Sequence, residues 1–347
     1  MQKLLPSYIL KVLKEVRVES KIASKQLPKI EDVIQDSNNN VLYIIVSDRP
    51  DRSALIGYGG LIIKKIKRKI NVNEVTVVAK TDLLIKRKRI SETIMKAKAI
   101  MKRRKIPQDI KEFLEILIEQ LRLEKKFPPR IITEREKAEN IKVLVAYSGG
   151  VDSTATLVLL KNMGFNVKAV TIDPGPFILP NWVRDNIAKA IKLLSIEHEF
   201  IKPIVDFHEI IEHAKEGTHM PCSLCYPLLT SSVYMYAVKN GINIVAFGDL
   251  ISTSKYSLDF PLRGKFLLRV NLPGALALTK HDTKLLSKGI VDWKPLYGCP
   301  LLRNSMKNHR WMRYIAIERV LREVRAGILE PMDGLRYIKS ILKLVGK

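Results

Sequence analysis

Acidic residues are in short supply in this chain. Its 347 residues include 35 Asp and Glu against 60 Lys and Arg, which leaves a formal net charge of +25 at pH 7. A surplus of this size indicates an anionic partner, and nucleic acid is the leading candidate because Lys and Arg make most contacts with phosphates. The alternative is a lysine-rich thermophile surface, but glutamate would then rise together with lysine.

Long apolar runs and cysteines are also scarce. No stretch approaches the ~20 apolar residues that span a bilayer. Residues 1–16 form an amphipathic pattern without the small-residue cleavage site of a signal peptide. We therefore expect a cytoplasmic protein with no membrane partner. Three cysteines in such a chain suggest metal or redox chemistry, or no role, rather than a disulfide framework.

The spacing of apolar residues changes along the chain. Residues 41–47 and 75–79 are predicted strands, and residues 61–70 between them are a predicted helix. From residue 141 onward, strands alternate with helices, which is typical of βαβ units and a parallel sheet. The sequence therefore predicts an α/β fold for the second part of the chain.

A glycine-rich loop follows the first of these later strands and opens a helix. It reads Ser148-Gly149-Gly150-Val151-Asp152-Ser153-Thr154. The two glycines let the backbone turn sharply, so main-chain N–H groups and the helix N-terminus form an anion site. The hydroxyls of Ser148, Ser153 and Thr154 add donors. Asp152 can cap the helix or help to hold a magnesium ion. The alternative is an ordinary glycine-rich turn with a capping aspartate.

This loop lacks the GxxxxGK[ST] spacing of a Walker loop and its lysine. It resembles instead the PP-loop of the ATP pyrophosphatase superfamily (N-type), whose SGGxDS pattern is met in full. The resemblance implies a HUP-like parallel-sheet domain that binds ATP, releases pyrophosphate and joins AMP to a substrate oxygen. It also implies nucleotide contacts at Asp173, after the second strand, and at Gly248, after the fourth. Asp173 is equally well explained as a solvated turn residue.

The three cysteines all follow the phosphate loop. Cys222 and Cys225 form a CxxC, whose spacing lets two thiolates bind one metal, and Cys299 comes later. With Pro295-Leu296 before Cys299, the arrangement resembles the three-cysteine iron–sulfur tRNA thiolation enzymes of this superfamily. The resemblance implies a [4Fe–4S] cluster on the three thiolates, with a fourth iron open to sulfide.

Other interpretations of the cysteines stay open. His219 with the three cysteines makes a zinc site of the Cys₃His type. A persulfide relay would have one cysteine carry sulfur and another resolve it. Three inert buried cysteines are the remaining option.

The sequence departs from the thiolation family after the fourth strand. The usual Gly-His-x-x-Asp-Asp is replaced by Gly248-Asp249-Leu250-Ile251-Ser252-Thr253, and Leu229 stands where a basic residue often follows the CxxC. The acid–base groups of the family therefore cannot be carried over. Asp249 is the local substitute, or it binds magnesium. The candidate catalytic residues are Asp249, Cys222 and Cys225.

A second glycine motif lies in the basic first part of the chain. Gly57-Tyr58-Gly59-Gly60 fits GxxG, with Lys64 and Lys65 beyond it. This resembles a KH domain, in which GxxG joins two helices and clamps a nucleotide backbone. Tyr58 is placed to stack on a base or to pack. The alternative is a glycine turn between two core helices.

Together these features predict a tRNA sulfurtransferase: the chain adenylates a uridine or cytidine oxygen and replaces it with sulfur. The partners would be tRNA and a sulfur donor, namely sulfide, a cysteine desulfurase or a sulfur-carrier protein, and a homodimer is an open option. The composition suggests an archaeal thermophile. The alternatives are a ligase with an amine nucleophile and a non-catalytic nucleotide-sensing RNA-binding protein. The expected segments are a helical segment (1–36), a KH-like α+β domain (37–100), a helical linker (101–140), the PP-loop domain (141–300) and a helical extension (301–347).

Overall fold

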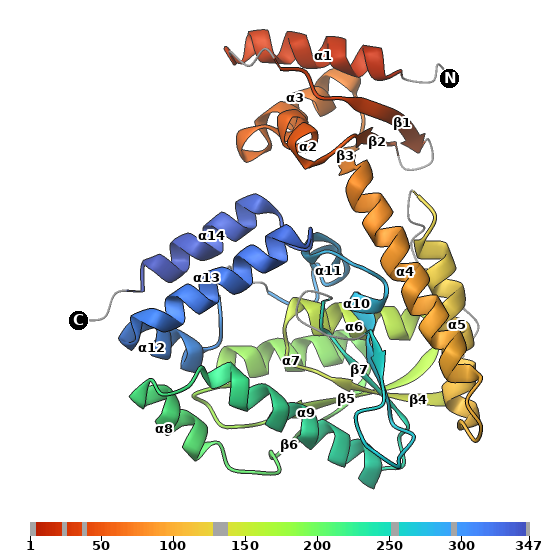
Figure 1. Ribbon diagram of the computed structural model, residues 1–347, viewed down its shortest axis with the longest axis vertical. Coiled ribbons are helices and arrows are strands. Elements are labelled where there is room, and N and C mark those ends of the chain that lie inside the picture. Colours follow the sequence, from red (N-terminus) through yellow and green to blue (C-terminus); the bar gives the residue numbers. More distant parts are fainter. Residues whose placement is uncertain are drawn as a thin grey trace. The chain divides into compact units, whose positions relative to one another are not determined.

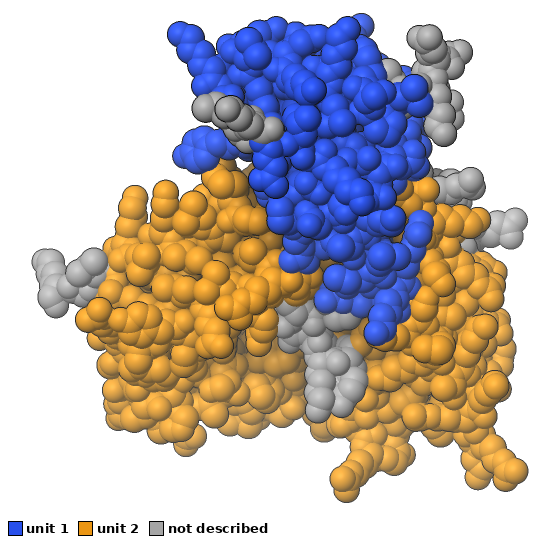
Figure 2. Space-filling model, turned by 45° about the horizontal axis from the view of Figure 1, so that its top comes forward, with its two compact units in different colours: residues 1–89 blue, residues 90–347 orange. Residues whose placement is uncertain are grey.

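The chain forms two compact units, Met1–Arg89 and Ile90–Lys347 (Figure 2). The computed structural model describes residues 5–22, 26–36, 40–127, 138–250, 257–292 and 297–344 (Figure 1). Helix α4 (Lys80–Met101) begins in the first unit and ends in the second. None of the helices described in these ranges is long and apolar enough to cross a membrane.

The first unit packs helices against a three-stranded sheet. Its elements in order are α1 (Pro6–Glu19), β1 (Ile30–Asp36), β2 (Val41–Val46), α2 (Arg49–Ile56), the 3-10 turn η1 (Tyr58–Gly60), α3 (Leu61–Ile70) and β3 (Glu74–Ala79). Strand β2 lies in the middle, antiparallel to β1 and parallel to β3. The predicted strands at 41–47 and 75–79 and the predicted helix at 61–70 are therefore present.

The core of this unit draws on α1 as well as on the sheet. Ile9 and Leu13 of α1 are buried with Leu42 and Ile44 of β2 and with Ile66 of α3. Helix α1 thus belongs to the same unit as the GxxG motif, and the unit ends at Arg89. The two units meet between Arg89 and Ile90, which is not one of the boundaries expected from the sequence. Those five expected segments stay a prediction.

The second unit is built on a six-stranded sheet in the order β6-β5-β4-β7-β9-β8. The strands are β4 (Ala138–Ala146), β5 (Phe165–Ile172), β6 (Glu197–Ile201), β7 (Ile244–Phe247), β8 (Leu258–Asp259) and β9 (Leu268–Asn271). All neighbouring pairs are parallel except β8 with β9. The predicted α/β fold with a parallel sheet is confirmed.

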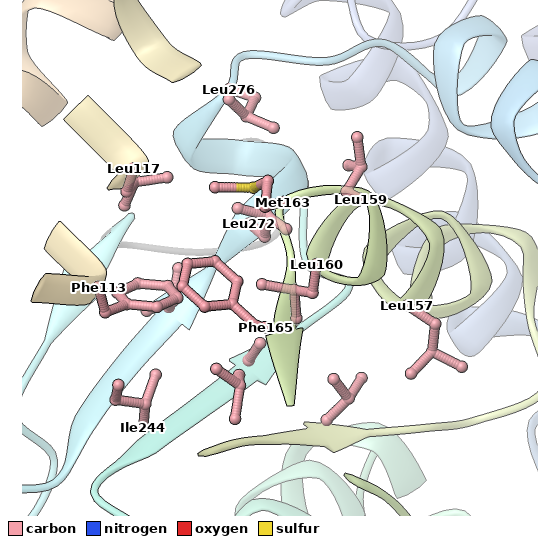
Figure 3. Close-up of a cluster of buried hydrophobic side chains, with 14 of the residues drawn as sticks. Phe113, Leu117, Leu157, Leu159, Leu160, Met163, Phe165, Ile244, Leu272 and Leu276 are labelled. Carbon is pink, nitrogen blue, oxygen red and sulfur yellow. The ribbon is translucent and has the colours of Figure 1, made fainter. Parts of the chain in front are cut away.

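Both faces of this sheet are buried. Val143 and Val145 of β4 face one hydrophobic cluster, whereas Leu144 between them belongs to another cluster with Val233 of α9. A strand covered on both sides reads as a continuous apolar run, which explains the sequence KVLVA. In the first cluster Phe113 of α5 packs on Phe165 of β5, with ring centroids 4.9 Å apart (Figure 3).

The helices of the second unit complete the layers. They are α5 (Gln108–Glu124), α6 (Val151–Asn162), α7 (Asn181–Leu194), α8 (His208–Glu216), α9 (Pro221–Lys239), α10 (Leu272–Ala275), α11 (Lys280–Leu286), α12 (Pro300–Asn308), α13 (Arg310–Arg325) and α14 (Pro331–Leu342). The chain moves outward from β4 to β5 and β6, then returns to β7 on the other side of β4. In α/β sheets such a reversal leaves a crevice at the carboxyl ends of the two central strands.

Candidate active site

The glycine-rich loop lies at this reversal, between β4 and α6. Gly149 has a φ of +71°, and a Cβ there would come within 2.8 Å of Ile187 Cγ1. The N-cap residue of α6 is Gly150, which has no side chain to bond the first N–H groups of the helix. Those N–H groups and the positive end of the helix dipole are therefore available to an anion.

Of the three hydroxyl side chains in the loop, that of Ser148 is exposed, whereas those of Ser153 and Thr154 are buried. Ser148 is exposed, and its Oγ lies 3.1 Å from Ser153 Oγ, which donates to the Gly150 carbonyl at 3.1 Å. Thr154 is fully buried, and its Oγ1 donates to the same carbonyl at 2.9 Å and lies 3.1 Å from Tyr147 Oη. In this position Thr154 stabilises the loop through hydrogen bonds inside the protein, and its expected role as a ligand donor stays a prediction.

Asp152 is held by two residues that the sequence did not point out. Lys280 Nζ donates to Asp152 Oδ2 at 2.5 Å, and Thr283 Oγ1 donates to Oδ1 at 2.7 Å. Burial acts to lower the pKa of Lys280, but the charge of Asp152 outweighs it and the pKa is raised. Lys280 is therefore a buried cation beside the phosphate loop. The expected magnesium site at Asp152 stays a prediction.

Asp173 follows β5 and is also paired. Its Oδ1 accepts from Arg184 Nη2 at 2.5 Å and from the Gly175 amide at 3.0 Å. The Arg184 guanidinium, lying 5.5 Å from the centre of the Phe200 ring, holds the pKa of Asp173 below its ordinary value. Asp173 thus shapes the turn after β5, and its expected contact with a nucleotide stays a prediction.

The lowered pKa of Asp173 predicts an effect of acid. A carboxyl whose folded pKa lies below its unfolded pKa adds stability above the unfolded value and loses it as the pH falls through the folded pKa. We expect Asp173→Asn to reduce the free energy of unfolding at pH 7 and to have a smaller effect in acid. Urea titrations of both proteins at several pH values measure this. An effect equal at every pH would contradict the assignment.

Gly248 and Asp249 bring the end of β7 to the loop. A Cβ on Gly248 would lie 2.6 Å from the Ser153 amide nitrogen and 2.9 Å from the Asp152 carbonyl carbon. The main chain at Gly248 therefore touches the start of α6. Asp249 Oδ2 accepts from Arg269 Nη2 at 2.8 Å and from the Tyr226 hydroxyl. Residues 251–256, which include Ser252 and Thr253, lie outside the described part of the chain.

The three cysteines are located at two helix N-termini. Cys222 and Cys225 are half-buried in the first turns of α9, and the exposed Cys299 is the N-cap of α12. Burial raises the pKa of Cys225 to about 12, and the charges of Cys299 and Cys222 add to this shift. Pro295-Leu296, expected before the third cysteine, lies outside the described residues.

The three cysteines offer the kind of donor atom that a metal centre would need. Soft thiolates suit iron–sulfur clusters and zinc. Within the described ranges, however, no group of three or more His, Cys, Asp or Glu side chains is arranged to hold a metal ion. His219 Nδ1 lies 3.2 Å from Thr218 Oγ1, and its ring lies 5.3 Å from that of His213. The Cys₃His zinc site expected as an alternative stays a prediction, as does the cluster.

The GxxG motif of the first unit has an exposed glycine turn. Gly57, Gly59 and Gly60 have φ values of +70°, +60° and +75°, which favour glycine. Tyr58 is 85% exposed, so its ring is free of the core. Lys64 is exposed on α3, but Lys65 Nζ donates to Ser20 Oγ at 2.8 Å. Lys64 is thus the more exposed of the two lysines, and the RNA contacts expected at both stay a prediction.

Comparisons with known proteins identify relatives of this chain. The family model described as the tRNA methyl transferase HUP domain matches residues 141–175. An uncharacterized protein of Methanocaldococcus jannaschii, MJ1638, is 32% identical over 245 residues, which cover 70% of this chain and 89% of that protein.

Two enzymes with named reactions match over shorter stretches. The tRNA-specific 2-thiouridylase MnmA 3 of Phocaeicola vulgatus is 35% identical over 106 residues, covering 26% of this chain and 28% of that enzyme. The tRNA-cytidine(32) 2-sulfurtransferase of Legionella pneumophila strain Corby is 31% identical over 127 residues, covering 34% of this chain and 43% of that enzyme. This chain thus spans less than half of either enzyme. Given the complete SGGxDS loop, the matching HUP domain and the relationship to MJ1638, the chain belongs to the PP-loop ATP pyrophosphatase superfamily, in the same family as MJ1638.

Proposed function

We propose that this protein is an ATP-dependent tRNA sulfurtransferase. The observation that supports it most is the arrangement around α6. A phosphate loop with an uncapped helix N-terminus is linked through Gly248, Asp249 and Tyr226 to the turn that carries Cys222 and Cys225. The shared stretches with the thiouridylase and the sulfurtransferase named above point to the same reaction.

The proposed reaction has two steps. A base oxygen of tRNA attacks the α phosphorus of ATP, the bond to the β phosphate breaks, and pyrophosphate leaves. A sulfide-level sulfur then attacks the activated ring carbon, and AMP leaves with the original oxygen. The α6 N-terminus and Lys280 would stabilise the negative charge at the phosphates. An external donor, sulfide or a sulfur-carrying protein, would supply the sulfur, and magnesium would accompany ATP.

The cysteines would hold an iron–sulfur cluster. When bound, such a group offers an iron that is not ligated by the protein and can bind sulfide. Cys222, Cys225 and Cys299 would be its ligands. The zinc interpretation uses the same three thiols together with His219, so metal content separates the two.

Metal analysis after anaerobic purification tests whether the cysteines hold a cluster. We expect a brown protein with about four irons per chain. Cys222→Ser, Cys225→Ser and Cys299→Ser should each remove most of the iron. Ser223→Ala, between the two cysteines, is the matched control and should keep it. A colourless protein with one zinc would contradict the cluster.

Pyrophosphate release tests the adenylation step. We expect AMP and pyrophosphate from ATP only when tRNA is added, and a thiolated nucleoside when a sulfur donor is also present. Mass spectrometry of digested tRNA identifies that nucleoside. Nucleotide binding without turnover would support a nucleotide-sensing protein. Turnover with an amine instead of sulfur in the product would support the ligase.

The GxxG loop would bind the tRNA backbone. A Cβ on Gly59 meets nothing within 4 Å, so Gly59→Asp should fit without a clash, and Asp tolerates positive φ better than most residues. With Gly60→Asp it puts two negative charges where phosphates would approach. We expect at least a tenfold loss in tRNA affinity in filter binding, with ATP affinity unchanged. Gly264→Asp, in an exposed loop at φ +72°, is the control. An equal loss there would contradict the KH-like role.

A further inference from the structure

Three side chains meet where the ends of β7, β9 and α9 come together. The Tyr226 hydroxyl donates to Asp249 Oδ2. Arg269 Nη2 donates to Asp249 Oδ2 at 2.8 Å and to Tyr226 Oη at 2.5 Å. We propose that Tyr226 is a positioning residue, which fixes the cysteine-bearing turn of α9 against the nucleotide end of the sheet and so sets the exposure of Cys225.

The path from the phosphate loop to the cysteines is short. Gly248 touches the main chain of Ser153 at the start of α6. Asp249 is the next residue, and its carboxylate accepts from Tyr226. Tyr226 follows Cys225 directly in the sequence. Tyr226 is joined to Asp249 directly and through Arg269, and both connections use the Tyr226 hydroxyl, so removing that hydroxyl would break the path.

The Arg269 side chain is held in place by several contacts. Its side chain is 16% exposed, and its guanidinium lies 4.5 Å from the centre of the Phe247 ring. It also donates to Tyr234 Oη at 2.9 Å and to Asn271 Oδ1 at 3.1 Å. A buried cation held from several sides has little freedom to follow a moving partner. Tyr226, which is 41% exposed, is the most exposed side chain of the three.

Tyr234 provides a matched control. It also bonds Arg269 and also belongs to α9, but it lies eight residues after Tyr226, about 12 Å farther along the helix. Tyr234→Phe removes one hydrogen bond to Arg269 and leaves the Tyr226–Asp249 bond in place. Both variants lose one hydroxyl that accepts from Arg269, and Tyr226→Phe also loses the bond to Asp249, so their difference reports on the Tyr226–Asp249 contact and on position together.

The test measures how fast each cysteine reacts in the intact chain. The wild type, Tyr226→Phe and Tyr234→Phe are treated with a chelator to free the thiols and then with iodoacetamide, and the alkylation of each cysteine is followed by peptide mass spectrometry. We expect Tyr226→Phe to raise the rate at Cys225 at least fivefold. The rate at Cys299 on α12, the affinity for a non-hydrolysable ATP analogue and the midpoint of thermal unfolding should change little. Tyr234→Phe should match the wild type in every reading.

Two outcomes would overturn the proposal. One is a Tyr226→Phe variant whose Cys225 reacts at the wild-type rate. The other is a similar change in all three cysteines, or in both tyrosine variants, which would show general loosening. The importance of Cys225 rests on the proposed function, but alkylation needs neither tRNA nor turnover. If the variant raises the alkylation rate at Cys225 but the wild type makes no thiolated nucleoside, the proposed function is wrong and the positioning role of Tyr226 is still supported.

Discussion

Replacing Lys280 with methionine is expected to weaken ATP binding about a hundredfold, or about 2.7 kcal/mol. Lys280 and Asp152 are 17% and 25% exposed, so the lysine leaves behind a largely buried carboxylate without its counter-charge. Breaking such a pair costs about 3–5 kcal/mol of stability when one partner is removed. The uncompensated charge would also repel the triphosphate at the α6 N-terminus. Fluorescence titration with a labelled ATP analogue measures the affinity.

Lys284 supplies the control for this prediction. It lies one turn farther along α11 and pairs with Asp333 at 2.7 Å, with the two side chains 23% and 19% exposed. Lys284→Met therefore removes a similar ion pair that belongs to α14 rather than to the loop. We expect it to lower the unfolding midpoint but to leave ATP affinity within about threefold. Equal losses of affinity in the two variants would show that Lys280 acts on stability alone.

The double variant Asp152→Asn with Lys280→Met separates two roles of the lysine. If Lys280 only neutralises Asp152, removing both charges restores much of the affinity. If the ammonium also attracts the phosphates, the double variant stays weak. We expect the second result, because a buried cation within reach of an anion site contributes more than it does in water.

Gly248→Ala is expected to abolish measurable ATP binding in a protein that still folds. The new methyl carbon would lie 2.6–2.9 Å from main-chain atoms of Asp152 and Ser153, which cannot move aside as a side chain can. Overpacking of this kind costs about 1–3 kcal/mol. The strain falls on the first turn of α6, whose N–H groups form the anion site. Calorimetry for affinity and circular dichroism for folding are the measurements.

Gly264→Ala shows what loss of a glycine costs by itself. Gly264 has a φ of +72° and open space around it, so alanine there introduces backbone strain without a clash. Its unfolding midpoint should fall and its ATP affinity should stay. If Gly248→Ala binds ATP as tightly as Gly264→Ala does, the contact between β7 and the loop has no functional weight.

The features that could be predicted from the sequence are those that depend on residues close together in the chain. Alternating apolar strands and helices predicted the parallel sheet, and the SGGxDS pattern predicted the phosphate loop, because both depend on neighbouring residues. The glycines at 149 and 248 meet backbone and side-chain atoms that leave no room for a Cβ. Their position at strand ends was the useful indication.

The partners of the charged residues could not be predicted in the same way. Lys280 reaches Asp152 across 128 positions, and Arg269 reaches Asp249 across 20. A lysine at the start of a short helix looks like an exposed residue until the tertiary fold buries it. The burial of Thr154 was hidden for a related reason, because the fold, and not the motif, decides which residues of the first helical turn face the core.

Calorimetric titration of the intact chain with an ATP analogue that resists cleavage between the α and β phosphates tests the main claim most directly. We predict uptake of one molecule per chain in the micromolar range, near −8 kcal/mol. The binding should disappear in Gly248→Ala and persist in Tyr226→Phe. No heat from a protein shown to be folded, or equal binding by the Gly248 variant, would contradict the assignment of residues 148–154 as the site that holds the triphosphate.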